Sequence, residues 1–151
     1  MPKHDVDYIR PVKTTKTSDD FAAHVRRGSN MPGLDYVVPV GTRVAASGRG
    51  VVLAVSSFPF QSRGKYVIIR HADGKQTHYF HLSKIFVKKG QRVEAGERIA
   101  LSGNTSSGNS TGPHLHFAFS HDGKFIDPAK VLKRERAEAR QDSANTDSSK
   151  I

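Results

Sequence analysis

The chain has 151 residues, no cysteine and a formal net charge of +10. This length allows one domain with a hydrophobic core, and the lack of cysteine excludes disulfides and thiolate metal sites, so that any metal must be held by His, Asp or Glu. The last nineteen residues are nearly neutral, so residues 1–132 carry most of the positive charge, which favours an anionic partner such as an acidic cell-wall polymer. No basic stripe interleaved with aromatic residues occurs, and nucleic acid is therefore not the predicted partner.

The first twenty residues, MPKHDVDYIRPVKTTKTSDD, lack the apolar core of a signal peptide. No apolar run of the sequence approaches the twenty residues of a membrane-spanning helix. We therefore expect a soluble chain that is made in the cytoplasm, with no ordinary secretion signal and no membrane span.

Residues 1–30 are predicted to form an N-terminal arm followed by a short helix. The helix is expected in SDDFAAHVRR, with Ser18 as its N-cap, Phe21 and Val25 on one side, and an end near Gly28. The arm before it is expected to be extended.

Glycine-punctuated runs typical of β-strands follow. They cover 35–47, 50–58, 64–71, 76–82, 91–103 and 113–120. Asp73-Gly74 and Asp122-Gly123 each stand between two such runs and predict two hairpins. The predicted fold class is mostly β, a single antiparallel β-sheet or sandwich domain with a short N-terminal helix and a C-terminal helix.

Asp127 and Pro128 form a suitable N-cap and first position for the C-terminal helix, which is predicted to run to about Arg140. The main domain is predicted to end near residue 132. Residues 133–151 are predicted to be the charged end of this helix and a mobile polar tail.

Two histidines in the stretch GNSTGPHLHFAFS raise the question of chemistry. Because strand side chains alternate, His114 and His116 are expected on one face, roughly 6–7 Å apart, with Leu115 and Phe117 on the other. Spacing alone allows two interpretations: a metal ligand beside a base, or two hydrogen-bonded histidines at the surface of a sheet.

The motifs around this pair of histidines help to decide between the two interpretations. Tyr-x-His-Leu at 79–82, Gly-x-x-Val-x-x-Gly at 90–96 and Gly-Pro-His-Leu-His-Phe at 112–117 occur in one order. In these motifs and their order, the chain resembles the M23-type or lysostaphin-like zinc metallopeptidases, which cut peptide bonds in bacterial peptidoglycan. The resemblance covers residues 31–132. The resemblance implies an antiparallel β fold, a zinc cofactor, and the stem or cross-bridge peptides of peptidoglycan as partner.

The resemblance also implies roles for single residues. His116 matches the metal-binding histidine of the family's His-x-His pair, and Asp35 matches its aspartate ligand. His114 matches the histidine beside the water, acting as general base or transition-state donor, and His81 matches the second catalytic histidine. Such residues suit a catalytic zinc, which takes three N or O ligands and keeps one position open.

One family ligand is absent, because the motif His-x-Gly-x-Asp has Met31 at its first position. A thioether is a poor ligand for Zn²⁺. Three interpretations stay open: a degenerate fold that binds zinc weakly or not at all and serves as a structural or cell-wall-binding module of a larger assembly; a site completed by another histidine; or deliberate replacement of the ligand. His24 is the better substitute and His4 the weaker one.

The remaining histidines have simpler predictions. Strand alternation places His81 on the face of Tyr79 and puts His78 on the opposite face, where it would be packed or solvated. His71 and His121 flank the two Asp-Gly turns and are predicted to lie on the surface.

The predicted function is thus a peptidoglycan-directed metallopeptidase domain if the zinc site is complete, and a module without activity if it is not. A single domain with short extensions and no signal peptide suits a phage lysin or a virion-associated protein that acts at the bacterial cell wall. The other subunits of a virion or assembly are then further expected partners.

Overall fold

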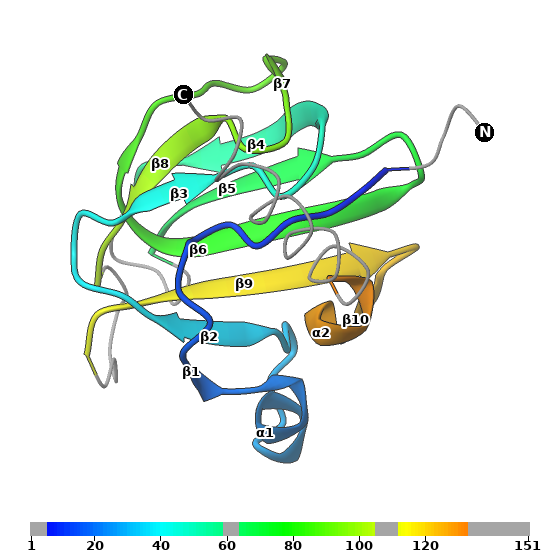
Figure 1. The fold of residues 1–151 in the computed structure, drawn as a ribbon. Coiled ribbons are helices and arrows are strands. Elements are labelled where there is room, and N and C mark those ends of the chain that lie inside the picture. The colour runs from blue at the N-terminus through cyan, green and yellow to red at the C-terminus, as the bar shows by residue number, and fades with distance from the viewer. Residues whose placement is uncertain (1–5, 59–63, 105–111, 133–151) are drawn as a thin grey trace, which may run out of the picture.

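Ten strands and two short helices make up the part of the chain that the computed structural model describes, residues 6–58, 64–104 and 112–132 (Figure 1). In chain order the first elements are β1 (Thr17–Asp19), α1 (Phe21–Arg26), β2 (Leu34–Val37), β3 (Arg43–Ala45), β4 (Gly50–Ser56) and β5 (Lys65–Arg70). The others are β6 (Lys75–Ile85), β7 (Arg92–Val93), β8 (Arg98–Ser102), β9 (His114–His121), β10 (Lys124–Ile126) and α2 (Pro128–Val131). The predicted fold class is confirmed.

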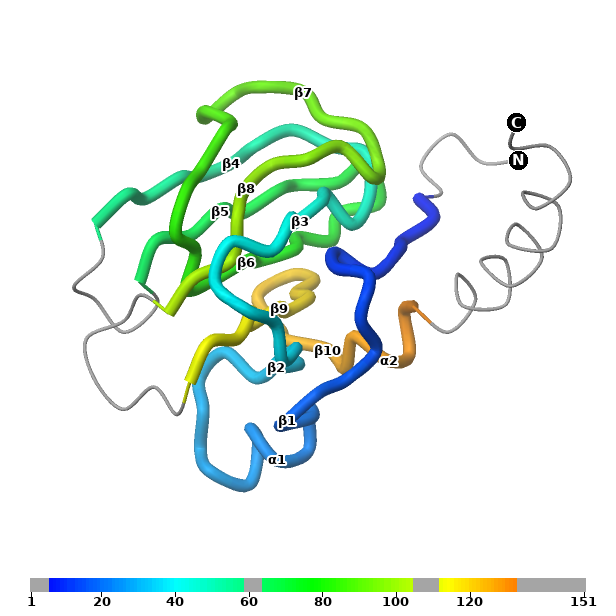
Figure 2. The backbone as a smooth tube through the Cα atoms, turned by 60° about the vertical axis from the view of Figure 1, so that its left-hand side comes forward, coloured from blue at the N-terminus to red at the C-terminus, as the bar shows by residue number. Residues whose placement is uncertain are grey.

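The sheet is antiparallel throughout, with the strand order β1-β2-β9-β6-β5-β4-β7. β10 pairs with β9, and β8 lies between β3 and β6. The eleven-residue β6 therefore changes partner along its length: its first half pairs with β9 and its second half with β8. β1 and α1 lie at the opposite end of the molecule from β4 and β7 (Figure 2).

The hydrophobic core lies on one face of β5, β6 and β9. Alternate side chains of these strands are completely buried there, as a period of two requires, namely Val67, Ile69, Tyr79, Leu115, Phe117 and Phe119. The N-terminal arm contributes too. Residues 6–16 form neither helix nor strand, yet Tyr8 and Val12 are buried in the same core, so the arm is a packed part of the domain.

The N-terminal helix begins two residues later than predicted. Asp20, and not Ser18, is the N-cap of α1, and its carboxylate accepts a hydrogen bond from the Ala23 N–H at 2.8 Å. Ser18 instead lies in β1, which pairs with β2 along the edge of the sheet. The predicted end is confirmed, because Gly28 has a φ of 76° and donates its N–H to the Val25 carbonyl.

Both predicted hairpins are present. Asp73-Gly74 joins β5 to β6, and Asp122-Gly123 joins β9 to β10 with φ values of 53° and 80°, the positive values of a type I′ turn. Asp127 caps α2 through the Ala129 N–H at 3.0 Å, as predicted. The rest of the predicted C-terminal helix and the tail lie outside the described residues.

Gly33 allows β2 to lie against β9. A Cβ atom at this position would overlap the carbonyl oxygen of Phe117, a backbone atom that cannot move aside. The close approach brings the two strands into register, with Asp35 opposite His116. Gly33 therefore permits the contact on which the candidate site depends.

His71 is buried, so its predicted place on the surface was wrong. Its Nδ1–H donates to the Arg49 carbonyl at 2.8 Å, and its Nε2 accepts from the Thr77 hydroxyl at 2.8 Å. The chain of hydrogen bonds continues because Tyr79 donates to Thr77 and accepts from the Ser47 N–H. The ring of Tyr8 from the N-terminal arm packs edge-on against His71, and this distant contact covers it.

We expect this buried histidine to make the protein less stable in acid. Burial lowers the pKa of His71 below its ordinary value, so the unfolded chain takes up this proton at higher pH than the folded one. The free energy of unfolding should thus fall as the pH drops below about 6.5, by up to about 1.4 kcal/mol per pH unit from this group. Urea unfolding with chelator at pH 7.5 and 5.5 checks this. His71→Gln, in which the other titratable groups are kept, should lose about 1 kcal/mol less than the wild type over this range, and equal losses would contradict the prediction.

Candidate metal centre and active site

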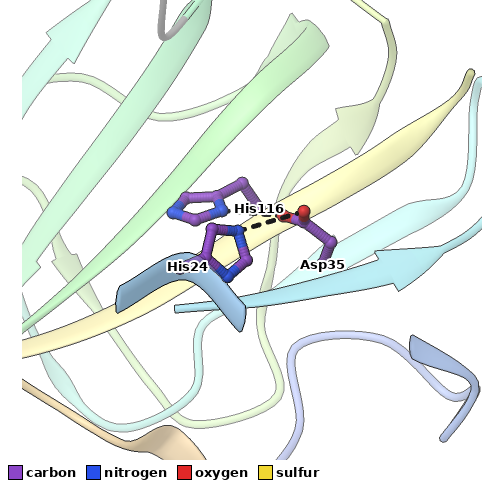
Figure 3. A group of neighbouring side chains, drawn as sticks. All are labelled: His24, Asp35 and His116. Carbon is purple, nitrogen blue, oxygen red and sulfur yellow. Dashed lines mark hydrogen bonds and ion pairs between the residues drawn. The ribbon is translucent and has the colours of Figure 1, made fainter. Parts of the chain in front are cut away.

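The carboxylate of Asp35 contacts two histidines, which come from different elements (Figure 3). His116 of β9 places Nδ1 2.7 Å from Oδ1 of Asp35, and His24 of α1 places Nε2 3.1 Å from Oδ2. All three residues are buried, with 5–8% of their surface exposed. The antiparallel pairing of β2 with β9 sets Asp35 opposite His116, and the turn from α1 into β2 brings His24 back over the carboxylate.

The far nitrogen of each ring is held by a backbone carbonyl. His24 Nδ1 lies 2.8 Å from the Asp20 oxygen, and His116 Nε2 lies 2.8 Å from the Met31 oxygen. A carbonyl only accepts hydrogen bonds, so both far nitrogens carry protons. In the neutral form of each ring, the nitrogen that faces Asp35 then has a lone pair directed at a carboxylate oxygen. The ring nitrogen and the carboxylate oxygen repel each other unless a proton or a cation lies between them.

The charge state of the cluster agrees with this geometry. Burial opposes ionisation of Asp35, but the hydrogen bonds from His116 and His24 outweigh it and hold the pKa of the carboxyl well below its usual range. Burial also lowers the pKa of His24, yet the hydrogen bond to Asp35 and the Asp20 carbonyl together raise it. The cluster thus keeps an anionic carboxylate that attracts positive charge into its centre.

A divalent cation fits this donor set. The three ligand atoms lie within 4.8 Å of one another, and two imidazoles with one carboxylate are the ligand types of catalytic zinc sites. A metal-binding histidine usually donates its other ring N–H to a carbonyl or carboxylate, and both histidines do so here. The residues therefore match a zinc site with three protein ligands.

The structure brings together the two predicted ligands, Asp35 and His116, and adds His24, the predicted substitute. Met31 contributes its backbone carbonyl to His116, a contact that sequence reasoning missed. His4 lies outside the described residues. Sequence reasoning also missed Phe80, whose ring stacks on His116 with a centroid distance of 5.3 Å and an interplanar angle of 10°.

His114 lies beside the cluster. Its Nδ1–H donates to the Gly112 carbonyl at 2.8 Å, and its Nε2 lies 3.9 Å from Oδ1 of Asp35. Holding the proton on Nδ1 leaves Nε2 as the basic nitrogen, directed toward the cluster. The ring of His81 lies 4.8 Å from that of His114 and 6.4 Å from that of His116. All the histidines that the resemblance assigns to the site are therefore neighbours.

The predicted face of His81 was wrong. β6 pairs with β9 up to Phe80 and with β8 from Leu82 onward, and His81 between them has a φ of 67°. This left-handed conformation breaks the alternation that would have put His81 in the core with Tyr79, and turns it toward His114. His78 is packed, as expected, and its Nε2 lies 2.8 Å from the Ser120 hydroxyl.

Comparison with known proteins assigns the chain to a family and agrees with the fold. The sequence profile of Peptidase family M23 matches residues 29–128, well over half of the chain, and the chain belongs to that family. It is 48% identical over 99 residues to peptidoglycan DD-endopeptidase ShyA of Vibrio cholerae, an alignment that covers 66% of the chain and 22% of ShyA.

Among the described residues, no helix is long and apolar enough to cross a membrane.

Two solved structures show the same fold. A zinc-containing peptidase from Vibrio cholerae aligns with a TM-score of 0.68 and 35% identity, over 80% of this chain and 39% of that one. The catalytic domain of lysostaphin from Staphylococcus simulans aligns with a TM-score of 0.62 and 29% identity, over 86% of this chain and 92% of that domain. The chain spans 20–30% of the length of the first curated relatives it matches.

Proposed function

We propose that this chain is a zinc-dependent hydrolase of peptide bonds in peptidoglycan, with its metal held by His24, Asp35 and His116. The observation that carries the proposal is the contact of one buried carboxylate with two imidazoles whose other nitrogens both donate to backbone carbonyls. When bound, zinc would polarise the scissile carbonyl and lower the pKa of water. The presence of a third ligand in His24 favours this function over a degenerate module.

The side chains around the metal have distinct roles in the proposal. His114 keeps its proton on Nδ1 through the Gly112 carbonyl, so Nε2 accepts the proton of the attacking water and later passes it to the leaving amine. His81 stabilises the negative charge that develops on the carbonyl oxygen by donating a hydrogen bond. Phe80 holds the ring of His116 by stacking against it and keeps that side of the cluster dry.

The substrate follows from the relatives and from the charge. ShyA, a peptidoglycan DD-endopeptidase, is 48% identical to this chain over 99 residues, and the catalytic domain of lysostaphin, an antimicrobial peptidase, has the same fold. Residues 1–132 carry most of the net charge of +10, and this positive charge attracts anionic polymers of the cell wall. We propose the bacterial cell wall as the place of action. The origin in a phage, and the association with a virion, stay predictions.

Zinc content and hydrolysis test the function together. Elemental mass spectrometry of the purified protein should give close to one zinc per chain, and the protein should release new amino groups from purified peptidoglycan until a chelator removes the metal. Zinc added back should restore activity. Near-zero zinc without hydrolysis would overturn the proposal and favour the degenerate module. One zinc per chain without hydrolysis would overturn the assigned substrate.

A further inference from the structure

The helix that supplies His24 is attached to the rest of the protein in an unusual way. His24 is the one fully buried side chain of α1; Phe21 and Ala23 are half-buried and Val25 is 52% exposed, so the helix buries no continuous apolar stripe. A helix of six residues is not stable by itself, and most helices in proteins are held by an apolar stripe. α1 is held at its centre by a histidine that faces a carboxylate.

The other attachments of this segment are limited. β1 pairs with β2 at Thr17 and Asp19, with an irregularity between the two positions. An ion pair of 2.9 Å joins Arg27 to Asp19, but the two side chains are 54% and 37% exposed, and ion pairs accessible to water contribute little. The contact between His24 and Asp35 is therefore a large part of what keeps α1 in place.

We propose that zinc binding and docking of residues 17–28, the β1–α1 segment, are one coupled step. This inference rests on the proposed metal site. When the segment is docked, the site has three ligands. When it is detached, only two ligands remain, Asp35 and His116, and the affinity for zinc falls. The segment precedes residue 29, where the family match begins, so the metal centre combines two ligands from the family domain with one from outside it. A partner that captures this segment would switch the site off.

The coupling predicts that zinc protects α1 from hydrogen exchange. The N–H groups of His24, Arg27, Gly28 and Ser29 report on docking, because each donates to a carbonyl of residues 20–25. In the full chain, free zinc at about 100 times its dissociation constant should slow exchange in a peptide covering residues 21–29 up to about 100-fold relative to chelated protein. Exchange in β5, which lies away from the site, should change far less.

Two variants, each with a matched control, sharpen the test. His24→Ala should abolish the zinc-dependent protection of residues 21–29, whereas Val25→Ala, next to it and exposed, should keep it. Asp20→Ala removes the helix cap but no ligand, so reciprocal coupling should weaken zinc binding about fivefold, and Asp20→Asn, which still caps, should restore it.

The outcomes separate this inference from the proposed function. If zinc binds with one equivalent but exchange of residues 21–29 is the same with and without it, the coupling is wrong and the metal site stands. If Asp20→Ala leaves zinc affinity unchanged, the coupling is wrong as well. If the wild type binds no zinc, the proposed function itself fails.

Discussion

Replacing His24 by alanine is expected to weaken zinc binding by about 100-fold or more. A structural zinc site with four protein ligands supplies roughly 10–16 kcal/mol, so each ligand accounts for about 3 kcal/mol, and each 1.4 kcal/mol is a factor of ten. His24 is buried and its Nε2 lies 3.1 Å from Oδ2 of Asp35, so the substitution removes a donor atom from the cluster itself. Competition titration with a chromophoric chelator measures the dissociation constant of each variant.

A second substitution tests whether His24 replaces the histidine that the family motif has at position 31. In the His24→Ala background, Met31→His should restore zinc affinity to within about tenfold of the wild type, because the new imidazole stands where the motif has its ligand. Met31→Ala alone should leave the affinity almost unchanged, since Met31 contacts His116 through its backbone carbonyl. The double variant thus transfers the third ligand from α1 to the position just before β2.

Each outcome identifies a ligand. If His24→Ala binds zinc as tightly as the wild type, the third ligand lies elsewhere. If Met31→Ala weakens binding as much as His24→Ala does, the thioether is a ligand. If the double variant stays weak, position 31 does not correspond to the family histidine.

The features predicted correctly from the sequence depend on residues close together in the chain. A period of two placed His114 and His116 on one face, and the two Asp-Gly pairs located both hairpins, because turn geometry is a local property. Asp35 was assigned to the site by the resemblance to the family motif, and the pairing of β2 with β9 does set it opposite His116. Each of these inferences needed only strand alternation or a short pattern.

The features that were missed depend on contacts between distant segments. His71 is covered by Tyr8, which lies 63 residues earlier in the chain, and a surface position was predicted because a hairpin end usually faces water. His81 stands where β6 exchanges β9 for β8, and an alternation rule cannot foresee this change of partner. The sequence ranked His24 above His4 as a substitute ligand, but the contact of His24 with Asp35 depends on how α1 turns back onto β2, which only the folded chain shows.

Replacing His114 by alanine is expected to lower kcat for peptidoglycan hydrolysis by about 10²- to 10⁴-fold while zinc content stays near one per chain. A positioned general acid–base group contributes a factor of this size. His114 is held by the Gly112 carbonyl with Nε2 toward the cluster, but it lies 3.9 Å from Asp35, farther than either of the two histidines assigned to the metal. Its loss should therefore remove proton transfer and leave the ligands in place.

His121 provides the matched control, because it is a histidine of the same strand whose side chain is 43% exposed at the far end of β9. His121→Ala should keep both kcat and zinc. His81→Ala should lower kcat with zinc retained, as expected of a neighbour that contacts the substrate and not the metal. If zinc is lost in proportion to activity in His114→Ala, His114 is a ligand of the metal, and if kcat is unchanged, its role as a base is wrong. Paired measurements of kcat and bound zinc in these three variants thus decide whether His114 and His81 hold the metal or act on the substrate.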